Sequence, residues 1–270
     1  MSGRLEVTIL GCGSSGGVPR VDGLWGACDP NEPRNRRSRC SMMARRLGAG
    51  PHEETTVLID TAPELRLQAG AAGVKRVDGV LYTHDHADQT HGIDDLRGFF
   101  LLSKGRRTPC WMDEYTHERL TGRFGYIFEG EGGYPAVCEA RRLPPLGEGF
   151  EVEGPSGPIP VMTFDQDHGD IQSVGYRLGP VAYSSDVAGL PEASFAALEG
   201  VEVWIVDALR IAPHPSHAHL DMALEWIERV KPERAILTNL LFDLDYRTLE
   251  RSLPPGVEPA YDGMRFELAL

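Results

Sequence analysis

Tyr82–Gly92 reads YTHDHADQTHG and places three histidines and two aspartates within eleven residues. The stretch follows an apolar run that ends at Leu81. Polar side chains directly after a buried strand are typical of the sites that α/β sheets build at the C-terminal ends of their strands. His84 and His86 are two residues apart, so in an extended segment both rings can point the same way. With Asp88 two residues further on, these alternate positions predict a metal site.

The same pattern of a strand followed by polar residues recurs along the chain. Strands are predicted over 6–10, 56–60, 79–83, 160–164, 173–178, 181–184, 200–207, 235–238 and 264–268, and helices over 63–72, 218–230 and 248–252. The ligand-type side chains at or after their ends are Asp60, His168, Asp186, His217 and Asn239. Imidazole nitrogens suit Zn²⁺, Mn²⁺ or iron, and a carboxylate can bridge two such ions. We therefore expect one or two divalent metal ions, Mn²⁺ or Zn²⁺, at these strand ends.

The composition is that of an ordinary globular protein. The 270 residues are 41% hydrophobic and 25% charged, enough for one large α/β domain or two small ones. The formal net charge is −13, and an acidic surface repels polyphosphate, so a long nucleic acid is not expected as a partner. The local exception is a group of arginines at 34–39. It is either a solvated face or a source of phosphate contacts, with Arg37 as the candidate substrate-binding residue.

Cysteine usage and the N-terminal sequence indicate a reducing compartment. The five cysteines are scattered and form no C-x-x-C pair, which favours free thiols over disulfides: Cys12, Cys28, Cys40, Cys110 and Cys138. The opening MSGRLEVTILG is typical of a first strand and not of a signal peptide. No apolar stretch approaches the ~18 residues of a membrane span. We expect a cytoplasmic protein without a membrane partner.

Two segments are not explained by the strand pattern. Residues 104–150 are rich in glycine, proline, arginine and aromatics, and we interpret them as a lid-like excursion over the site within a single domain of residues 1–270. Tyr126 in this segment is a candidate for stacking on a base or sugar of the substrate. The glycine-rich turn 11–17 lacks the helix and the Lys-Ser/Thr ending of a phosphate-binding loop. We interpret it as a close approach of the backbone beside the metals.

The ligand motifs resemble those of the metallo-β-lactamase fold. His84-x-His86-x-Asp88 follows a strand, and His168-Gly169 and Ser185-Asp186 fit the third and fourth ligand motifs of that family. Three further segments resemble the PhnP-type phosphodiesterases, which are related to tRNase Z: LGCGSSGGVPR from Leu10, HGIDDLR from His91 and LTNLLFDLDY from Leu237. The resemblance spans residues 10–246 and implies a four-layer αββα sandwich with the metals at one edge.

The resemblance implies a ligand for each metal position. The first metal would be bound by His84, His86 and His168. Asp186 would bridge to a second metal, and Asp88 would bind that metal on the side opposite the bridge. Asp88 therefore counts both as a metal ligand and as a catalytic residue.

The chain departs from the family pattern at the second metal. Gln89 and Asn239 stand where the family has histidines. An amide oxygen is a weak, hard ligand that favours Mn²⁺ or Mg²⁺ over Zn²⁺, so the second site is expected to be weak. His91 either substitutes for a missing ligand or hydrogen-bonds to a ligand from outside the coordination sphere.

The resemblance also implies a reaction, the hydrolysis of a phosphodiester in a small molecule such as a nucleotide or a cyclic phosphate. Hydroxide held at the metals would attack phosphorus, and His217 would protonate the departing oxygen as general acid, with His214 and His219 as alternatives. A tRNase Z-like nuclease and a ligand-binding protein on a decayed enzyme site remain alternative functions, and the fold also supports thioesterases and lactonases. Because related hydrolases are often dimers, a homodimer is expected.

Overall fold

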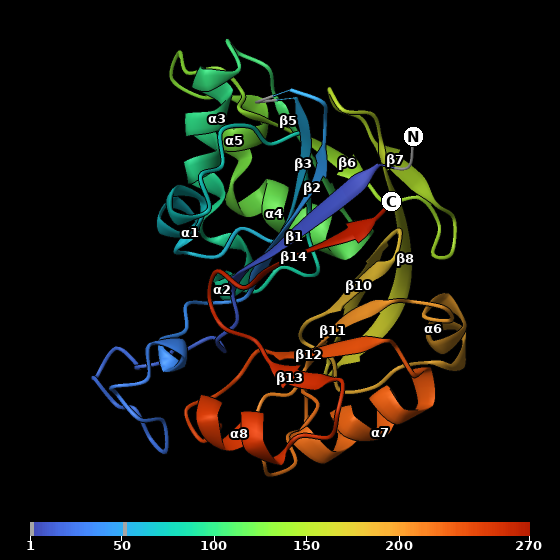
Figure 1. The fold of residues 1–270 in the computed structure, drawn as a ribbon. Coiled ribbons are helices and arrows are strands. Elements are labelled where there is room, and N and C mark those ends of the chain that lie inside the picture. Colours follow the sequence, from blue (N-terminus) through green and yellow to red (C-terminus); the bar gives the residue numbers. More distant parts are fainter. Residues whose placement is uncertain (1–2, 51–52) are drawn as a thin grey trace.

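The computed structural model describes residues 3–50 and 53–270, which form four layers (Figure 1). Two β-sheets lie face to face, and helices cover the outer face of each sheet. The arrangement confirms the αββα sandwich expected from the sequence. Within these residues, no helix combines the length and the apolar character needed to cross a bilayer.

The first sheet has seven strands in the described part of the chain, in the order β14–β1–β2–β3–β4–β5–β6. Their bounds are β1 Arg4–Gly11, β2 Ser41–Leu47, β3 Glu54–Ile59, β4 Gly79–Leu81, β5 Thr108–Met112, β6 Cys138–Arg142 and β14 Arg265–Ala269. Strands β3 to β6 run parallel. The segments between them supply the outer helices α1 Leu65–Ala71, α2 Ala87–Thr90, α3 Leu96–Leu102, α4 Glu114–Arg123 and α5 Gly125–Glu129. A parallel strand is covered on both faces, which is why every residue of β4 is buried.

The second sheet also has seven strands in the described residues, in the order β13–β12–β11–β10–β9–β8–β7. Their bounds are β7 Phe150–Val152, β8 Ile159–His168, β9 Ile171–Leu178, β10 Val181–Ser184, β11 Val203–Asp207, β12 Arg234–Thr238 and β13 Val257–Pro259. Its outer helices are α6 Glu192–Ala197, α7 Leu220–Val230 and α8 Tyr246–Ser252, and short 3-10 turns lie at Pro33–Asn35 and Ile93–Asp95. Ala223 and Ile227 of α7 share an apolar cluster with Trp204 and Leu237 of this sheet.

Alternation along the strands places one face of each sheet in a common core. Leu5, Val7 and Ile9 of β1 lie in the same buried cluster as Tyr176 and Leu178 of β9. Burying an aliphatic side chain of this size stabilises the fold by about 1.5–3 kcal/mol. This shared core holds the two sheets in one relative position, and so it determines which strand ends meet at the edge of the sandwich.

Residues 104–150 differ from the irregular lid that we expected. They contain β5, α4, α5 and β6, and β5 and β6 complete one edge of the first sheet. Helix α4 begins after Asp113, whose carboxylate accepts a hydrogen bond from the N–H of Thr116. Leu120 and Ile127 are fully buried against the outer face of the sheet. Many apolar residues of this segment are therefore core residues, whereas Tyr115, Tyr126, Tyr134 and Leu146 are exposed.

Further strands also differ from the sequence prediction, and β7 and β13 are among those that were not predicted. Strand β2 was not predicted, although it pairs with both β1 and β3 in the middle of the first sheet. Strand β8 continues past the predicted end at residue 164 because its last four residues pair with β9, ending with His168 opposite Ile171. His168 is thus the last residue of a strand and does not lie in a loop.

Candidate metal centre

The candidate site lies at the edge of the sandwich where strands of both sheets end. Asp60 follows β3, Asp186 follows β10 and Asn239 follows β12. The three residues have positive φ angles of 63°, 55° and 61°. Aspartate and asparagine are among the few non-glycine residues that adopt this conformation readily. A sharp turn after each strand thus brings these polar side chains to the same edge.

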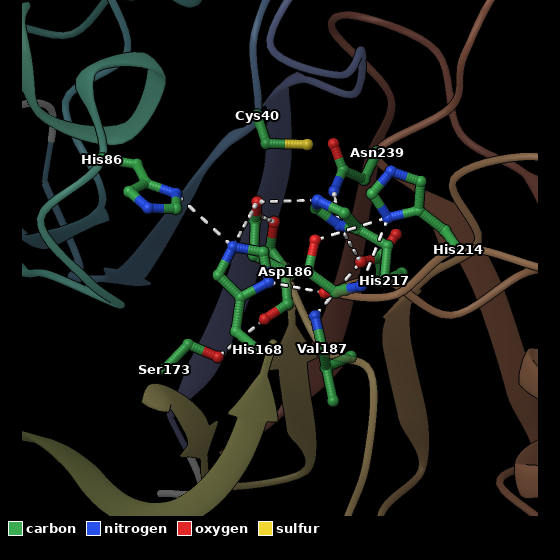
Figure 2. Close-up of polar contacts among 12 residues, drawn as sticks. Cys40, His86, His168, Ser173, Asp186, Val187, His214, His217 and Asn239 are labelled. Carbon is green, nitrogen blue, oxygen red and sulfur yellow. Dashed lines mark hydrogen bonds and ion pairs between the residues drawn. The ribbon is translucent and has the colours of Figure 1, made fainter. Parts of the chain in front are cut away.

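Three imidazoles converge at this edge. His84, His86 and His168 each offer a ring nitrogen, and these three atoms lie within 4.8 Å of one another. His168 Nε2 is 3.4 Å from His86 Nδ1, and Figure 2 shows the two ring edges facing each other. Neutral imidazoles at this spacing form a donor set for Zn²⁺, Mn²⁺ or a similar divalent ion.

A chain of hydrogen bonds from Asp60 through Thr83 to His84 leaves Nε2 of His84 without a proton. Asp60 accepts from the N–H of Thr83 at 2.8 Å and from its hydroxyl at 2.9 Å. The same hydroxyl lies 3.0 Å from His84 Nδ1, and because its own proton goes to Asp60, it accepts the Nδ1 proton. Burial lowers the pKa of His84 to about 3, so the ring is neutral. Its Nε2 is buried and has no partner within the described residues, as expected for an atom that binds a metal.

The backbone of a neighbouring loop orients His168. His168 Nδ1 lies 2.6 Å from the carbonyl oxygen of Ser216 and donates to it, so Nε2 faces the other imidazoles. Gly169 permits this approach. Its φ is +63°, and a Cβ at this position would lie only 2.8 Å from the Cβ of Ser216. A partner on the far ring nitrogen fixes the tautomer of a metal-binding histidine.

Asp186 has one carboxylate oxygen bound by protein donors and one that faces the imidazoles. Its Oδ2 accepts from Gln89 Nε2 at 3.0 Å and from the hydroxyl of Ser185. Its Oδ1 lies 3.9 Å from His168 Nε2 and 4.0 Å from His217 Nε2. Burial by itself would raise the pKa of Asp186, but the surrounding imidazoles hold it below its usual value. The carboxylate is therefore ionised and available as a ligand through Oδ1.

His217 forms a buried pair with Asp207, the last residue of β11. His217 Nδ1 lies 2.8 Å from Asp207 Oδ2, and Asn239 Nδ2 lies 3.2 Å from the same ring nitrogen (Figure 2). Burial opposes protonation of His217, but the hydrogen bond and charge of Asp207 raise the pKa of His217 to about 9. Burial raises the pKa of Asp207 to about 6. Near neutral pH the pair is therefore imidazolium and carboxylate, with Nε2–H of His217 facing Asp186.

The remaining candidate ligands lie at different distances from this cluster. Asp88 is half-buried, and burial together with the charge of Asp186 raises its pKa to about 6. His91 is exposed, and its ring packs edge-on against Phe124 at 5.6 Å between ring centroids. The charges of Asp88 and Asp186 thus interact, whereas the ring of His91 packs against Phe124.

The two candidate substrate-binding residues do not reach the site. Arg37 is only 2% exposed, and its guanidinium donates to the carbonyls of Leu241 at 3.1 Å and Leu244 at 2.6 Å. It therefore ties the N-terminal segment to the loop after β12 and does not contact ligands. Tyr126 lies on α5, outside the set of residues that line the cavity over the imidazoles.

That cavity has a volume of about 520 Å³. It is lined by the candidate site residues His86, Asp88, His168, Asp186, His217 and Asn239, and also by Ser14, Arg20, Arg210, His214 and Phe242. The two arginines and Asp207 were not predicted as site residues. Asp207 could have been found from its place at the end of a predicted strand, and Arg20 from its place at the end of the LGCGSSGGVPR segment, whereas nothing in the sequence distinguishes Arg210 from other arginines.

Comparison with known proteins agrees with this architecture. A model of the β-lactamase superfamily domain matches residues 55–238 and defines the protein as a hydrolase of the metallo-β-lactamase fold. The chain is 34% identical to a structurally characterised diphosphatase of the PhnP family, over 100% of its own length and 99% of that chain, with a TM-score of 0.88. This protein therefore belongs to the β-lactamase superfamily and, within it, to the PhnP family.

Other solved structures share the fold, and one curated protein is similar in sequence. Zn²⁺-bound PqqB from Methylobacterium extorquens is 17% identical, with 97% of this chain and 100% of that chain covered and a TM-score of 0.73. The short form of human tRNase Z is 15% identical, with 97% and 98% covered and a TM-score of 0.65. An octanoyltransferase of Porphyromonas gingivalis is 28% identical over 96% of this chain. The chain spans about half, 51%, of the length of that curated relative.

Proposed function

We propose that this protein is a metal-dependent hydrolase that cleaves a phosphodiester in a small molecule such as a nucleotide or a cyclic phosphate. The observation that carries the proposal is the convergence of the imidazoles of His84, His86 and His168, where Nε2 of His84 is buried and has no hydrogen-bond partner among the described residues. The His217–Asp207 pair and the cationic residues Arg20 and Arg210 belong to the same site.

The imidazoles and Asp186 form the stronger of two proposed metal positions. His84, His86 and His168 would hold a divalent ion together with Asp186, and Asp88 would contribute to a weaker second position. A bound Zn²⁺ or Mn²⁺ polarises a phosphoryl oxygen and lowers the pKa of water in the site.

His217 is the proposed proton donor to the leaving group. Its Nδ1–H is bound to Asp207, so Nε2 is the nitrogen that faces the cavity and can deliver a proton to the departing ester oxygen. Asp207 keeps the ring in one orientation during this transfer. His214 also lines the cavity, but no carboxylate of the described residues lies within 4.0 Å of it, so its ring lacks this support. His219 stands at the start of α7, outside the cavity lining.

Arg20 and Arg210 replace Arg37 as the proposed phosphate contacts. Arg210 donates from Nε and Nη2 to carbonyls of its own loop and has no carboxylate within 4.0 Å among residues 3–50 and 53–270. Arg20 has only Asp22, at 3.6 Å on the protein surface. Both guanidinium groups therefore keep charge and N–H groups available for a phosphoryl group.

A substrate screen in the presence of Mn²⁺ or Zn²⁺ tests the proposal and its alternatives. We expect turnover of bis(p-nitrophenyl) phosphate or of a 2′,3′-cyclic nucleotide. Because the PhnP-family relative is a diphosphatase, a dinucleoside diphosphate belongs in the same screen. The double variant His84→Ala, His86→Ala should lose both turnover and bound metal, whereas Arg251→Gln on the exposed face of α8 should lose neither.

Two outcomes of the screen would replace the proposal. Cleavage of a precursor tRNA with no turnover of small diesters would favour the tRNase Z-like alternative. Retention of metal and binding of nucleotides without turnover of any substrate would favour a ligand-binding protein on a decayed site.

A further inference from the structure

A second cavity lies on the other side of His86. It has a volume of about 570 Å³, and His86 lines both this cavity and the one that contains His217. Its other walls come from the turn around the candidate metal-binding motif, from one face of α4 and from the start of β9, through Asp85, Ala87, His91, Tyr115, Arg119, Arg123 and Ile171. The imidazole cluster is thus bordered by two cavities, which lie on either side of His86.

Helix α4 gives the second cavity an excess of positive charge. Arg119 Nε lies 3.2 Å from Asp85 Oδ2, and Arg123 Nη2 lies 2.9 Å from the same oxygen. Arg123 Nη1 also donates to the backbone carbonyl of Asp85 at 2.7 Å. Two guanidinium groups share one carboxylate, so one positive charge among the lining residues is not compensated. In a chain of net charge −13, such a place favours an anionic ligand.

The same face of α4 presents an aromatic ring. Tyr115 is 45% exposed, and the guanidinium of Arg119 lies 5.4 Å from its ring centroid. The exposed part of the ring offers a surface on which a planar base can stack, and the adjacent cation strengthens such contacts. An aromatic ring beside an uncompensated cation matches the chemistry of a nucleoside that carries a phosphate.

We infer that the cavity beside α4 binds the part of the substrate that remains on phosphorus, and that it selects a nucleotide-like group. The inference rests on the proposed phosphodiester hydrolysis. In that reaction a water oxygen bonds to phosphorus, the bond to one ester oxygen breaks, and the departing alcohol takes a proton. The retained group leaves as a phosphate monoester. His217 lines only the first cavity, so the departing group belongs there and the retained group extends past His86.

This assignment moves the stacking role from Tyr126 to Tyr115. Residues 104–150 do contribute an aromatic side chain beside the candidate metal centre, but they do so from a helix packed on the first sheet and not from a lid. Tyr115 and Arg119 are one turn apart on α4, so the helix itself sets the spacing between the stacking surface and the cation.

Two esters with the same leaving group test the inference. Methyl p-nitrophenyl phosphate and the p-nitrophenyl ester of thymidine 5′-monophosphate both release p-nitrophenol and differ only in the retained group. For the natural protein, kcat/KM should favour the thymidine ester. In Tyr115→Ala this preference should fall about tenfold, within the range expected for one lost base–aromatic stack.

Tyr134→Ala is the matched control. Tyr134 is 71% exposed and has Arg97 over its ring at 5.8 Å, but it lines neither cavity. The preference for the thymidine ester should persist in this variant. An unchanged preference in Tyr115→Ala, or an equal loss in Tyr134→Ala, would overturn the stacking role.

Adding a phosphate to the retained group tests whether the positive charge of Arg119 contributes to substrate binding. The thymidine 3′-phosphate 5′-(p-nitrophenyl phosphate) ester should be preferred over the thymidine ester, and Arg119→Gln should remove that gain while Arg97→Gln preserves it. Loss of the gain in both variants, or in neither, contradicts the charge assignment.

Binding measurements separate a failure of this inference from a failure of the proposed function. If the metal-loaded protein hydrolyses neither p-nitrophenyl ester and none of the phosphate substrates of the screen, the proposed hydrolysis is wrong. Calorimetry with thymidine 5′-monophosphate and methyl phosphate then examines the cavity alone. Preferential binding of the nucleotide that disappears in Tyr115→Ala supports the nucleotide cavity, and equal binding of the two ligands refutes it.

Discussion

Replacing Gln89 and Asn239 by histidine should convert a weak second metal position into a tight one. In the natural chain, Gln89 Nε2 donates at 3.0 Å to Asp186 Oδ2, the carboxylate oxygen that faces away from His168 and His217. Asn239 Nδ2 lies 3.2 Å from His217 Nδ1. Both positions thus carry amides that contact the proposed bridge or the proposed proton donor. We expect one ion to remain bound through dialysis and a second to bind only at high concentrations of Mn²⁺.

The magnitude follows from the ligands that are restored. Changing a single partner of a metal ligand alters affinity by about 10–100-fold, so two added imidazoles should tighten the second site by about 10²–10⁴-fold. The substitution also has a cost without metal. Gln89 is fully buried, and losing its hydrogen bond to the Asp186 carboxylate should destabilise the protein by about 1.5–3 kcal/mol. Histidine, like asparagine, is tolerated at the positive φ of position 239.

Metal should reverse this loss of stability. A ligand present at 100 times its dissociation constant stabilises the folded state by about 2.7 kcal/mol, which offsets the lost hydrogen bond. Calorimetric titration with Mn²⁺ and thermal unfolding with and without metal measure the two effects. Gln68→His is the control, because Gln68 is also buried but contacts Ser38 and Arg39 instead of the candidate centre. Two sites of similar high affinity in the natural protein would refute the reasoning and would require another residue, such as His91 or His217, to complete the second site.

Four further predictions concern other parts of the molecule. Asp207→Asn should lower kcat by about 10²–10⁴-fold for an alkyl phosphodiester and by much less for a p-nitrophenyl ester. The reason is that an alkoxide is the poorer leaving group and needs the proton from His217, whereas p-nitrophenolate does not. Equal losses for the two esters would contradict the role of His217 as the acid. Asp245→Ala should lower the free energy of unfolding at pH 7 by about 1–2 kcal/mol, since Asp245 caps α8 and accepts from Asn35. Burial would raise the pKa of Asp245, but the hydrogen bonds to its carboxylate lower this pKa to about 2. The stabilisation is therefore present above the ordinary pKa of 3.8 and disappears as the pH falls towards 2. Chemical denaturation should show a smaller difference in unfolding free energy between the variant and the natural protein at pH 2.5 than at pH 7. All five cysteines are free and buried, so a thiol reagent should titrate them only after unfolding, and a disulfide in non-reducing mass spectrometry would contradict this. Light scattering at micromolar concentration tests the expected homodimer, and a monomer would remove that expectation.

Local patterns in the sequence predicted a candidate metal-binding motif at strand ends, and the resemblance to the metallo-β-lactamase family predicted the αββα sandwich. Apolar runs that lead into Asp60, His84 and Asp186 predicted polar side chains at strand ends, where α/β sheets build their sites. The spacing of His84 and His86 predicted that both rings face one point, and the structure brings the two ring nitrogens together with that of His168. These features depend on the periodicity of a single strand, which neighbouring residues determine.

The partners that orient the site depend on packing between segments far apart in the chain. The carbonyl of Ser216, which orients His168, lies 48 residues away, and nothing local distinguishes it from other carbonyls. The same holds for Arg37, whose guanidinium is buried against Leu244, 207 residues away, while the exposed Arg20 reaches the cavity. Helix α4 lies beside His86 because β5 and β6 extend the first sheet, although composition alone suggested a lid over 104–150. Strand periodicity thus determined which residues could bind metal. The shared core between the two sheets decided which other side chains contact those residues, because only that core sets the distance between the sheet edges.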